Sequence, residues 1–376
     1  REVWRRFAEH YHLFRATPSR LWLDHTFETL FAMTVPLGPQ TADFYFDRIG
    51  EQLSDAEFRP RRLFERFNIE VLATTEGALD DLAWHEEIAA SGWGGRIITT
   101  YRPDSVTDPD FEGFCDNLRR FGDVTGSDTQ GWSGYLEAHR RRRAFFRAAG
   151  ATATDHGHPS ADTADLPPDE AAALYALVAG GRADAVDKKL FRAQMLTEMA
   201  RMSVEDGMVM QIHAGAHRNH SPSIHRLFGR DKGFDMPARA SYVDALKPML
   251  DAVGLEPGLR VIVFTLDETA YARELAPLAG AYPCLKLGPP WWFYDSVEGM
   301  LRHRRATIET AGFYNTAGFN DDTRALPSIP ARHDVARRVD CAFLSELVLT
   351  GRLREDEAAE LAADLAVNLA RAAYRL

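Results

Sequence analysis

Short apolar runs alternate with amphipathic stretches along most of this chain, and this alternation limits the folds that it can form. Seven apolar runs follow one another: Ile69–Ala73, Arg96–Thr100, Ala151–Thr154, Met208–Ile212, Arg260–Thr265, Cys284–Leu287 and Phe313–Phe319. Helical periodicity lies between most of them, at Pro168–Ala179, Lys189–Met202, Ala240–Val253 and Glu268–Ala276. Strands that alternate with helices pair in parallel through right-handed crossovers, so the sequence predicts an α/β fold.

Polar or aromatic side chains follow every one of these runs. The segments concerned are Thr74–Gly77, Tyr101–Asp104, Asp155–His158, His213–Asn219, Leu266–Glu268, Gly288–Trp292 and Asn320–Arg324. Functional groups at the end of each strand are typical of one mouth of a (β/α)8 barrel. A doubly wound sheet would place function at one switch point and usually has a glycine-rich phosphate loop, which this sequence lacks. We therefore predict a (β/α)8 barrel, with one of its eight strands unaccounted for.

The pattern divides the chain into three parts. Residues 1–68 are helical in period and rich in aromatic residues, and we expect them to pack on the barrel as a helical segment. Residues 69–352 hold the seven predicted strands of the barrel, which the family resemblance described below numbers as strands two to eight. Residues 353–376 are rich in alanine, with glutamates early and arginines late, which suits the dipole of a closing helix.

Charge and cysteine content exclude several classes of protein. The net charge of −11 argues against binding to nucleic acid or to an anionic membrane surface. No apolar run approaches the length of a membrane span. The three cysteines are scattered and odd in number, which favours a reducing cytoplasm over a disulfide framework. We expect a cytoplasmic protein that acts on a small molecule, with a homo-oligomer as the expected form.

Two residues are candidate metal ligands. His213 ends the run Met208–Ile212, and a neutral imidazole at the end of a barrel strand commonly holds a divalent metal. The alternative is a core histidine bonded to a backbone carbonyl. Asp322 follows the last run, where a carboxylate can bind a metal and also exchange a proton as a general base. The alternative for Asp322 is the N-cap of a helix.

Three arginines follow three different strands, and they are Arg102, Arg218 and Arg324. The planar guanidinium fork can bind both oxygens of a carboxylate. Any one of the three could be a surface ion pair, but together they favour a shared anionic ligand. Trp291 and Trp292 follow two prolines and are expected to form a rigid aromatic wall, although core packing would also explain one of them.

Histidines at two other places need separate treatment. His156, beside Asp155, could take part in acid-base chemistry or could belong to a polar turn. His10 and His12 alternate as paired metal ligands on a strand would, but the segment before them is charged and helical in period. Positions i and i+2 of a helix do not face each other, so we do not expect these two histidines to be ligands.

The run from Ile69 to Arg338 resembles uronate isomerase, the sugar-acid isomerase branch of the amidohydrolase superfamily. The order and approximate spacing of six motifs agree, and residues 1–68 resemble the family's helical segment that precedes its second barrel strand. The matching stretches are Val71–Thr75, Arg102–Asp104, Asp155-His156, Gln211–His213 with Gly215, Ala216 and Arg218, Gly288 with Trp291–Phe293 and Asp295, and Asp322–Arg324 with Arg332 and His333.

The resemblance implies a distorted (β/α)8 TIM barrel of the metal-dependent hydrolase type, with an N-terminal helical segment and one divalent metal ion, with Zn2+ as the expected ion. The implied ligands are His213 on strand five and Asp322 on strand eight. The family also uses a His-x-His pair on strand one. That strand would lie upstream of the opening helices, so the metal site is expected to be incomplete in these residues. The sequence departs from the family at Glu76-Gly77 and at Asp321, where a change of substrate preference, or of activity itself, is expected.

The implied activity is the interconversion of aldose and ketose forms of hexuronates, D-glucuronate to D-fructuronate and D-galacturonate to D-tagaturonate. Asp322 would open the sugar ring and move protons, with His156 as a weaker acid-base candidate. Arg102 and Arg324 would bind the carboxylate or the enediolate, and Trp292 would shape the pocket. Two alternatives remain at this point: a metal-dependent hydrolase on the same barrel, and a non-catalytic protein that binds sugar acids.

Overall fold

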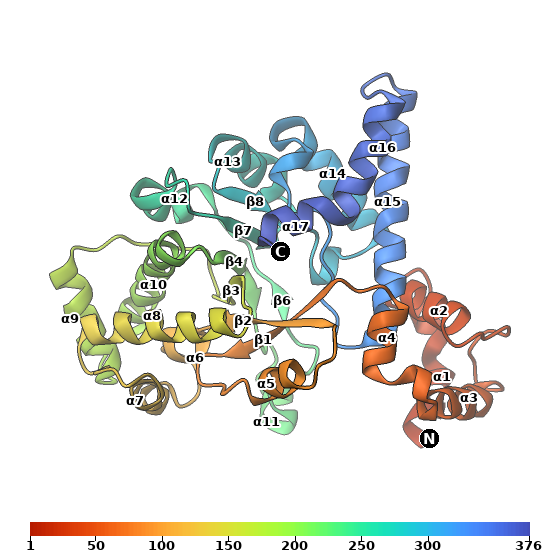
Figure 1. Cartoon of the computed structure of the whole chain (residues 1–376), viewed down its shortest axis with the longest axis horizontal. Helices are drawn as coiled ribbons and strands as arrows, with labels where there is room; N and C mark the ends of the chain where they lie inside the picture. Colours follow the sequence, from red (N-terminus) through yellow and green to blue (C-terminus); the bar gives the residue numbers. More distant parts are fainter.

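A six-stranded parallel sheet forms the centre of the molecule, as the computed structural model of residues 1–376 shows (Figure 1). Its strands are β1 (Val71–Gly77), β2 (Arg96–Arg102), β3 (Ala153–His156), β4 (Val209–Ala214), β7 (Val261–Thr265) and β8 (Leu285–Leu287). They are added in sequence order, and a short antiparallel pair, β5 (Ala216–His217) and β6 (Met236–Pro237), lies outside the sheet. A doubly wound sheet would reverse its strand order at a switch point. The order without reversal therefore fits the wall of a barrel.

Helices connect the strands, and several of them pack against the outer face of the sheet. They are α5 (Ala83–Ala90), α6 (Asp104–Thr107), α7 (Phe114–Thr125), α8 (Trp132–Ala148), α9 (Pro168–Ala179), α10 (Ala185–Asp206), α11 (Pro222–Phe228), α12 (Val243–Val253), a π-helical turn (Tyr271–Leu275), α13 (Ala276–Ala281) and α14 (Val297–Ala311). The ends of α10 follow from its sequence. Asp184 accepts hydrogen bonds from the backbone at its start, and Gly207 ends it with a left-handed φ of +78°.

Side chains of the strands alternate between the outer core and the inside of the barrel, as a period of two requires. Met210, Ile212 and Ala214 of β4 belong to the large apolar cluster beneath the outer helices. Val209 belongs instead to a small separate cluster with residues such as Phe264 of β7. The residues between the outward ones on β4 therefore point inward, and His213 is the last of them.

The prediction that Phe313–Phe319 forms a seventh strand was wrong. A 3₁₀ turn covers Phe313–Asn315, and a single bridge joins Thr316 to the end of β8. The backbone then turns away at Gly318, whose φ is +71°, and the amide of Phe319 donates to the carbonyl of Leu365, 3.2 Å away. The amide of Ala317 still donates to the carbonyl of Leu287 at 2.8 Å, but Phe319 bonds to the C-terminal segment, so no continuous strand ladder forms.

We expect Gly318→Ala to lower the free energy of unfolding by about 1–3 kcal/mol, because its left-handed φ disfavours any side chain. A Cβ atom there would also lie 2.9 Å from the carbonyl oxygen of Leu365. Gly351→Ala is the matched control, since Gly351 has a φ of +72° but nothing within 4 Å of the added carbon. Urea unfolding of both variants would separate the contact from the backbone strain. Equal losses would contradict a role for the contact.

The sheet does not close on itself, because β1 lies at one edge and the bridge at Thr316 lies at the other. Thr75 is paired in register with Thr100, two residues before the inward-facing Arg102, so Ala73 and Thr75 lie on the inner face of β1. Both are exposed, which is unusual for the inside of a barrel. Six strands and one bridge account for seven of the eight barrel positions, as the sequence pattern predicted.

The N-terminal helices form a bundle beside the sheet, at one end of α15 (Ile329–Leu349) (Figure 1). The bundle consists of α1 (Glu2–His10), a 3₁₀ turn (Tyr11–Phe14), α2 (Pro18–Thr29), α3 (Ala42–Ser54), a second 3₁₀ turn (Ala56–Phe58) and α4 (Pro60–Arg66), and it has its own apolar core. His25 Nε2 lies 3.0 Å from Asp334 Oδ2 of α15. His10 and His12 are exposed on this bundle. The proposed boundaries at residues 68 and 352 stay a prediction.

The C-terminal segment returns to the sheet. It contains α16 (Glu355–Ala363), a π-helical turn (Asp364–Asn368) and α17 (Leu369–Tyr374), and the C-terminus lies beside the strands (Figure 1). The hydroxyl of Tyr374 donates to Oε1 of the inward-facing Gln211 at 2.8 Å. The inside of the sheet is therefore filled in part by the last helix of the chain.

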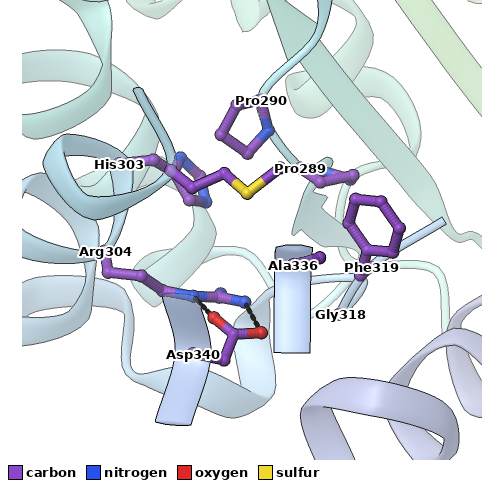
Figure 2. A pocket seen from close by; sticks show the side chains of 9 residues that line it. Pro289, Pro290, His303, Arg304, Gly318, Phe319, Ala336 and Asp340 are labelled. Carbon is purple, nitrogen blue, oxygen red and sulfur yellow. Dashed lines mark hydrogen bonds and ion pairs between the residues drawn. The ribbon is translucent and has the colours of Figure 1, made fainter. Parts of the chain in front are cut away.

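A buried ion pair joins α14 to α15. Arg304 binds both carboxylate oxygens of Asp340, at 2.8 and 3.0 Å, and both side chains are almost wholly buried. Figure 2 shows this pair beside a small cavity that Pro289, Pro290 and Phe319 also line. A bidentate pair fixes orientation as well as distance. The pair therefore fixes how α14 lies against α15.

Two further observations bear on the class of protein. No helix of the structure is long and apolar enough to cross a membrane. Cys115, Cys284 and Cys341 are all free thiols, and Cys284 is buried.

Candidate active site

Three neighbouring strands place a chain of charged groups inside the barrel. His213 ends β4, and its Nδ1 lies 2.6 Å from Oδ1 of Asp155 on β3. The other oxygen of Asp155 accepts from the guanidinium of Arg102 on β2. Because an ionised carboxylate only accepts hydrogen bonds, the His213 proton lies on Nδ1. The Nε2 atom of His213 makes no hydrogen bond within the protein, so in the neutral imidazole it would carry the unshared lone pair.

The two neighbours of Asp155 keep its carboxylate ionised. Burial alone would raise the pKa of Asp155, but the neighbouring His213 and Arg102 outweigh burial and hold that pKa well below its usual range. Burial would likewise lower the pKa of Arg102, yet Asp155 and Asp104 raise it. Asp155 therefore stays a carboxylate that orients the imidazole on one side and the guanidinium on the other.

Trp291 connects the two predicted metal ligands. Its ring meets the ring of His213 edge-on at 4.8 Å between centroids, while His213 stacks on Phe264 at 4.1 Å. The indole Nε1 donates to Oδ2 of Asp322 at 3.2 Å. Thus His213 and Asp322, which are 109 residues apart in the chain, contact the same indole. The side chain of Asp322 is exposed at this edge.

Trp292 and Arg218 form a second contact at the same edge. The ring of Trp292 lies 4.5 Å from that of Trp291, and the guanidinium carbon of Arg218 lies 5.3 Å from the centre of the Trp292 ring. Trp292 has a φ of +50°, which is unusual for a bulky residue. Such a conformation persists only where the surroundings hold it, and it is common at functional sites. Arg218 is also anchored by Asp235, at 3.3 Å.

The structure does not bring all the predicted residues together. Arg324 is exposed and makes no hydrogen bond or ion pair, so nothing in the chain fixes its position. His156 lies on the opposite face of β3 from Asp155, fully buried, with its Nε2 3.0 Å from the hydroxyl of Thr154. Burial lowers the pKa of His156 well below its ordinary value. His156 therefore contacts neither His213 nor Asp322, and the acid-base role predicted for it has no support from these contacts.

The two departures from the family pattern have structural partners. Glu76 lies on the outer face of β1, where it accepts from Thr99 and lies 3.7 Å from His85 Nε2. Asp321 pairs with Arg332, which also binds Asp295. Burial raises the pKa of Asp321 to about 6, against the opposing charge of Arg332. Glu76 thus points away from Asp155, and the carboxylate of Asp321 is paired with Arg332.

Sequence reasoning considered Asp155 with His156 as a possible acid-base pair, but it did not predict that Asp155 would bind His213 and Arg102. Asp155 and His156 are adjacent on a strand, so only one of them can point inward. The partners that decide which one does so lie on other strands. No pattern in the sequence indicated that Tyr374 would reach Gln211.

The whole arrangement has counterparts in known proteins. The family model described as glucuronate isomerase matches residues 1–374. The chain belongs to the glucuronate isomerase family. It is 66% identical to a uronate isomerase of Mesorhizobium japonicum over all 376 of its residues, which cover 80% of that relative.

Solved structures of the family agree in fold. The glucuronate isomerase of Caulobacter crescentus superposes with a TM-score of 0.98 at 57% identity, over 100% of this chain and 78% of the other. The uronate isomerase of Thermotoga maritima gives a TM-score of 0.94 at 26% identity, over 99% of this chain and 82% of the other. The predicted family and the barrel fold are therefore confirmed.

The residues present fit a divalent metal in part. His213 Nε2 and Asp322 Oδ1 make no hydrogen bond, and nitrogen and oxygen donors of this kind suit zinc. Two protein donors are fewer than the three that hold a typical catalytic zinc. A separate group of possible ligands, Asp104, His156 and His158, lies on the other face of β3.

Proposed function

We propose that this protein interconverts the aldose and ketose forms of hexuronates, with D-glucuronate and D-galacturonate as substrates. Membership of the glucuronate isomerase family supports the reaction. The observation that carries the proposal is the convergence of Arg102, Asp155 and His213 with Trp291 and Asp322 at the ends of the strands. This site combines a cation for a sugar carboxylate with carboxylates that can hold or move a proton.

Substrate binding is assigned to the arginines and the tryptophan pair. Arg102 has one end held by Asp155, and its side chain is 38% exposed, so it can meet a ligand carboxylate at the inner face. Arg218, stacked on Trp292, offers a second cation at the rim. Arg324 is free to turn toward a bound anion. The rings of Trp291 and Trp292 form an apolar wall against one face of the sugar.

Proton transfer is assigned to Asp322. Isomerisation moves a proton from C2 to C1 through an enediol, so negative charge develops on the sugar oxygens. The exposed carboxylate of Asp322 can accept and return a proton, while the indole N–H of Trp291 fixes its direction. Asp155 keeps His213 and Arg102 oriented, and nearby guanidinium groups offset the developing charge. His156 is not assigned a part in this step, because it is buried on the opposite face of β3 from Asp155.

One divalent metal ion, with zinc as the expected ion, is part of this proposal. His213 Nε2 and Asp322 are the residues of this chain that would hold it, and the ion would supply positive charge beside the sugar oxygens. Metal analysis of the purified protein checks the identity of the ion. The cytoplasmic location and the homo-oligomeric state also stay predictions.

Proton NMR in D2O tests the reaction. We expect metal-loaded protein to convert D-glucuronate, D-galacturonate or both to the ketose, and the relative rates identify the preferred epimer. Deuterium at C1 of the product would show that the shuttled proton exchanges with solvent. No change in either sugar, with the metal confirmed bound, would contradict the proposed function.

A further inference from the structure

A second group of metal-ligating side chains lies outside the site described above. Asp104 begins α6, His156 ends β3 on its outer face, and His158 follows two residues later. Their ligand atoms all lie within 4.8 Å of one another. None of the three has a part in proton transfer or sugar binding as assigned above.

The histidines of this group are buried without partners. Both ring nitrogens of His158 lack a hydrogen bond, although the residue is only 3% exposed. Nδ1 of the fully buried His156 lacks one as well. Buried polar atoms in native proteins are nearly always paired, so an unpaired set that converges on one point calls for a ligand. A cation would satisfy these nitrogens.

The nearby cations neutralise the other carboxylates around this group but pair only weakly with Asp104. Asp155 pairs with Arg102, and Asp108, near His158, pairs with Arg192 at 2.8 Å. Asp104 is less well matched, because its nearest cation is Arg102 Nε at 3.8 Å, too far for a hydrogen bond. The only hydrogen bonds that its carboxylate accepts are two long ones from the backbone amide of Gly157, at 3.3 Å.

The protonation states also suit a metal. Burial lowers the pKa of His158 to about 4 and lowers that of His156 as well, so both imidazoles are neutral at pH 7 and keep a lone pair. Burial raises the pKa of Asp104 to about 6, which still leaves it mainly ionised at pH 7. Metal ligands must be deprotonated in this way.

We propose that Asp104, His156 and His158 bind one divalent transition-metal cation, with zinc the best match, at a site separate from His213 and Asp322. Two imidazoles and one carboxylate are a common zinc ligand set. Donor atoms around one zinc lie roughly 3.3 Å apart, given bond lengths of about 2.0–2.1 Å, so distances between the donor atoms, now within 4.8 Å, would shorten by up to about 1.5 Å.

Gly157 permits this approach. A Cβ atom on Gly157 would lie 2.9 Å from Oδ2 of Asp104, so a larger residue would push the carboxylate out of the group. Asp104 is also the second acidic neighbour of Arg102. A cation that drew Asp104 toward the histidines would therefore change the surroundings of a residue assigned to substrate binding.

Metal counting in variants tests the proposal. The full chain is stripped with a chelator and titrated with Co2+ and Zn2+, and bound metal is measured by equilibrium dialysis and elemental analysis. Asp322→Asn serves as the background because it weakens the other site. We expect the Asp322→Asn protein to bind one equivalent of metal. Adding Asp104→Asn or His158→Gln should weaken metal binding by at least roughly 10- to 100-fold, which is the cost of losing a residue that only hydrogen-bonds to a ligand.

His303→Gln is the matched control. His303 is 1% exposed and both of its ring nitrogens are unpaired, but it belongs to no group of possible ligands. It should leave the metal count unchanged, which separates loss of a ligand from loss of a buried histidine. Asp104→Asn preserves side-chain volume and the acceptor for the Gly157 amide, so it also tests the site if His158→Gln fails to fold.

Two results would overturn the proposal. One is the absence of any bound metal in the Asp322→Asn protein at saturating Co2+ or Zn2+. The other is a retained equivalent of unchanged affinity when Asp104 or His158 is replaced in a folded variant. Neither measurement depends on turnover, so the isomerase function stands or falls separately in the NMR assay.

Discussion

Asp322→Asn is expected to lower kcat for both hexuronates by about 10²- to 10⁴-fold, the usual contribution of a positioned acid or base. The amide has nearly the same size, and its oxygen can still accept from Trp291 Nε1, which lies 3.2 Å from Asp322 Oδ2. The fold should therefore persist while the group that accepts a proton is lost. Steady-state kinetics with D-glucuronate and D-galacturonate, together with circular dichroism, measure the two effects.

Asp231→Asn is a suitable control for this change. Asp231 is an exposed carboxylate 3.7 Å from Arg218, so it tests whether the removal of any negative charge near the rim slows the enzyme. Its kcat should stay close to that of the unchanged protein. A folded Asp322→Asn protein with full turnover would rule out Asp322 as the residue that moves the proton.

Asp155→Asn should reduce both stability and turnover. The substitution leaves Arg102 without its carboxylate, and breaking a buried ion pair costs about 3–5 kcal/mol. We expect a value near the lower limit, because the Arg102 side chain is 38% exposed. Turnover should fall because His213 and Arg102 lose the group that orients both. Urea unfolding and steady-state kinetics measure these losses.

The stability effect should depend on pH in a defined direction. The pKa of Asp155 in the folded protein lies below its ordinary value, because His213 and Arg102 outweigh the effect of burial. A group with a lowered pKa stabilises the fold above its unfolded pKa, about 3.9, and loses that contribution as the pH falls toward the folded pKa. The difference between the unchanged protein and Asp155→Asn should be constant from pH 7 to about pH 5 and should shrink below about pH 4.

Asp162→Asn provides the comparison. Asp162 pairs with Lys189 at 2.9 Å, but both side chains are partly or largely exposed, so its loss should cost only about 0–1 kcal/mol. If Asp155→Asn were no more destabilising than Asp162→Asn at pH 7, the ion pair of Asp155 with Arg102 would not stabilise the fold as its burial indicates.

Much of the fold follows from local patterns in the sequence. Six of the seven apolar runs form strands of the predicted sheet, and Pro168–Ala179 forms a helix with the predicted bounds. These patterns are readable because each strand or helix must bury one face, and that need sets a period of two or of 3.6 residues. The failure at Phe313–Phe319 has a physical cause: a strand requires a partner along its whole length, and Leu365 takes the hydrogen bond of Phe319 instead.

The sequence predicted which strand ends form the candidate site, but it did not predict which side chains contact one another there. His213 and Asp322 were expected at one edge, and both contact Trp291 there. The choice of Asp155 over His156 depends on which face of β3 points inward, and residues on β2 and β4 decide that. The free side chain of Arg324 likewise could not be foreseen, because no local pattern reports the absence of a partner.

Local patterns were thus sufficient to predict the family, the parallel strand order and the edge of the sheet where the functional side chains lie. Local hydrophobic periodicity and motif order carry that information. The three-dimensional fold was needed to show that Asp155 binds both Arg102 and His213. It was also needed to show that Asp104 lies close to His156 and His158. Such contacts join residues that are distant in the chain, and their geometry depends on how neighbouring strands are aligned, which no short segment encodes.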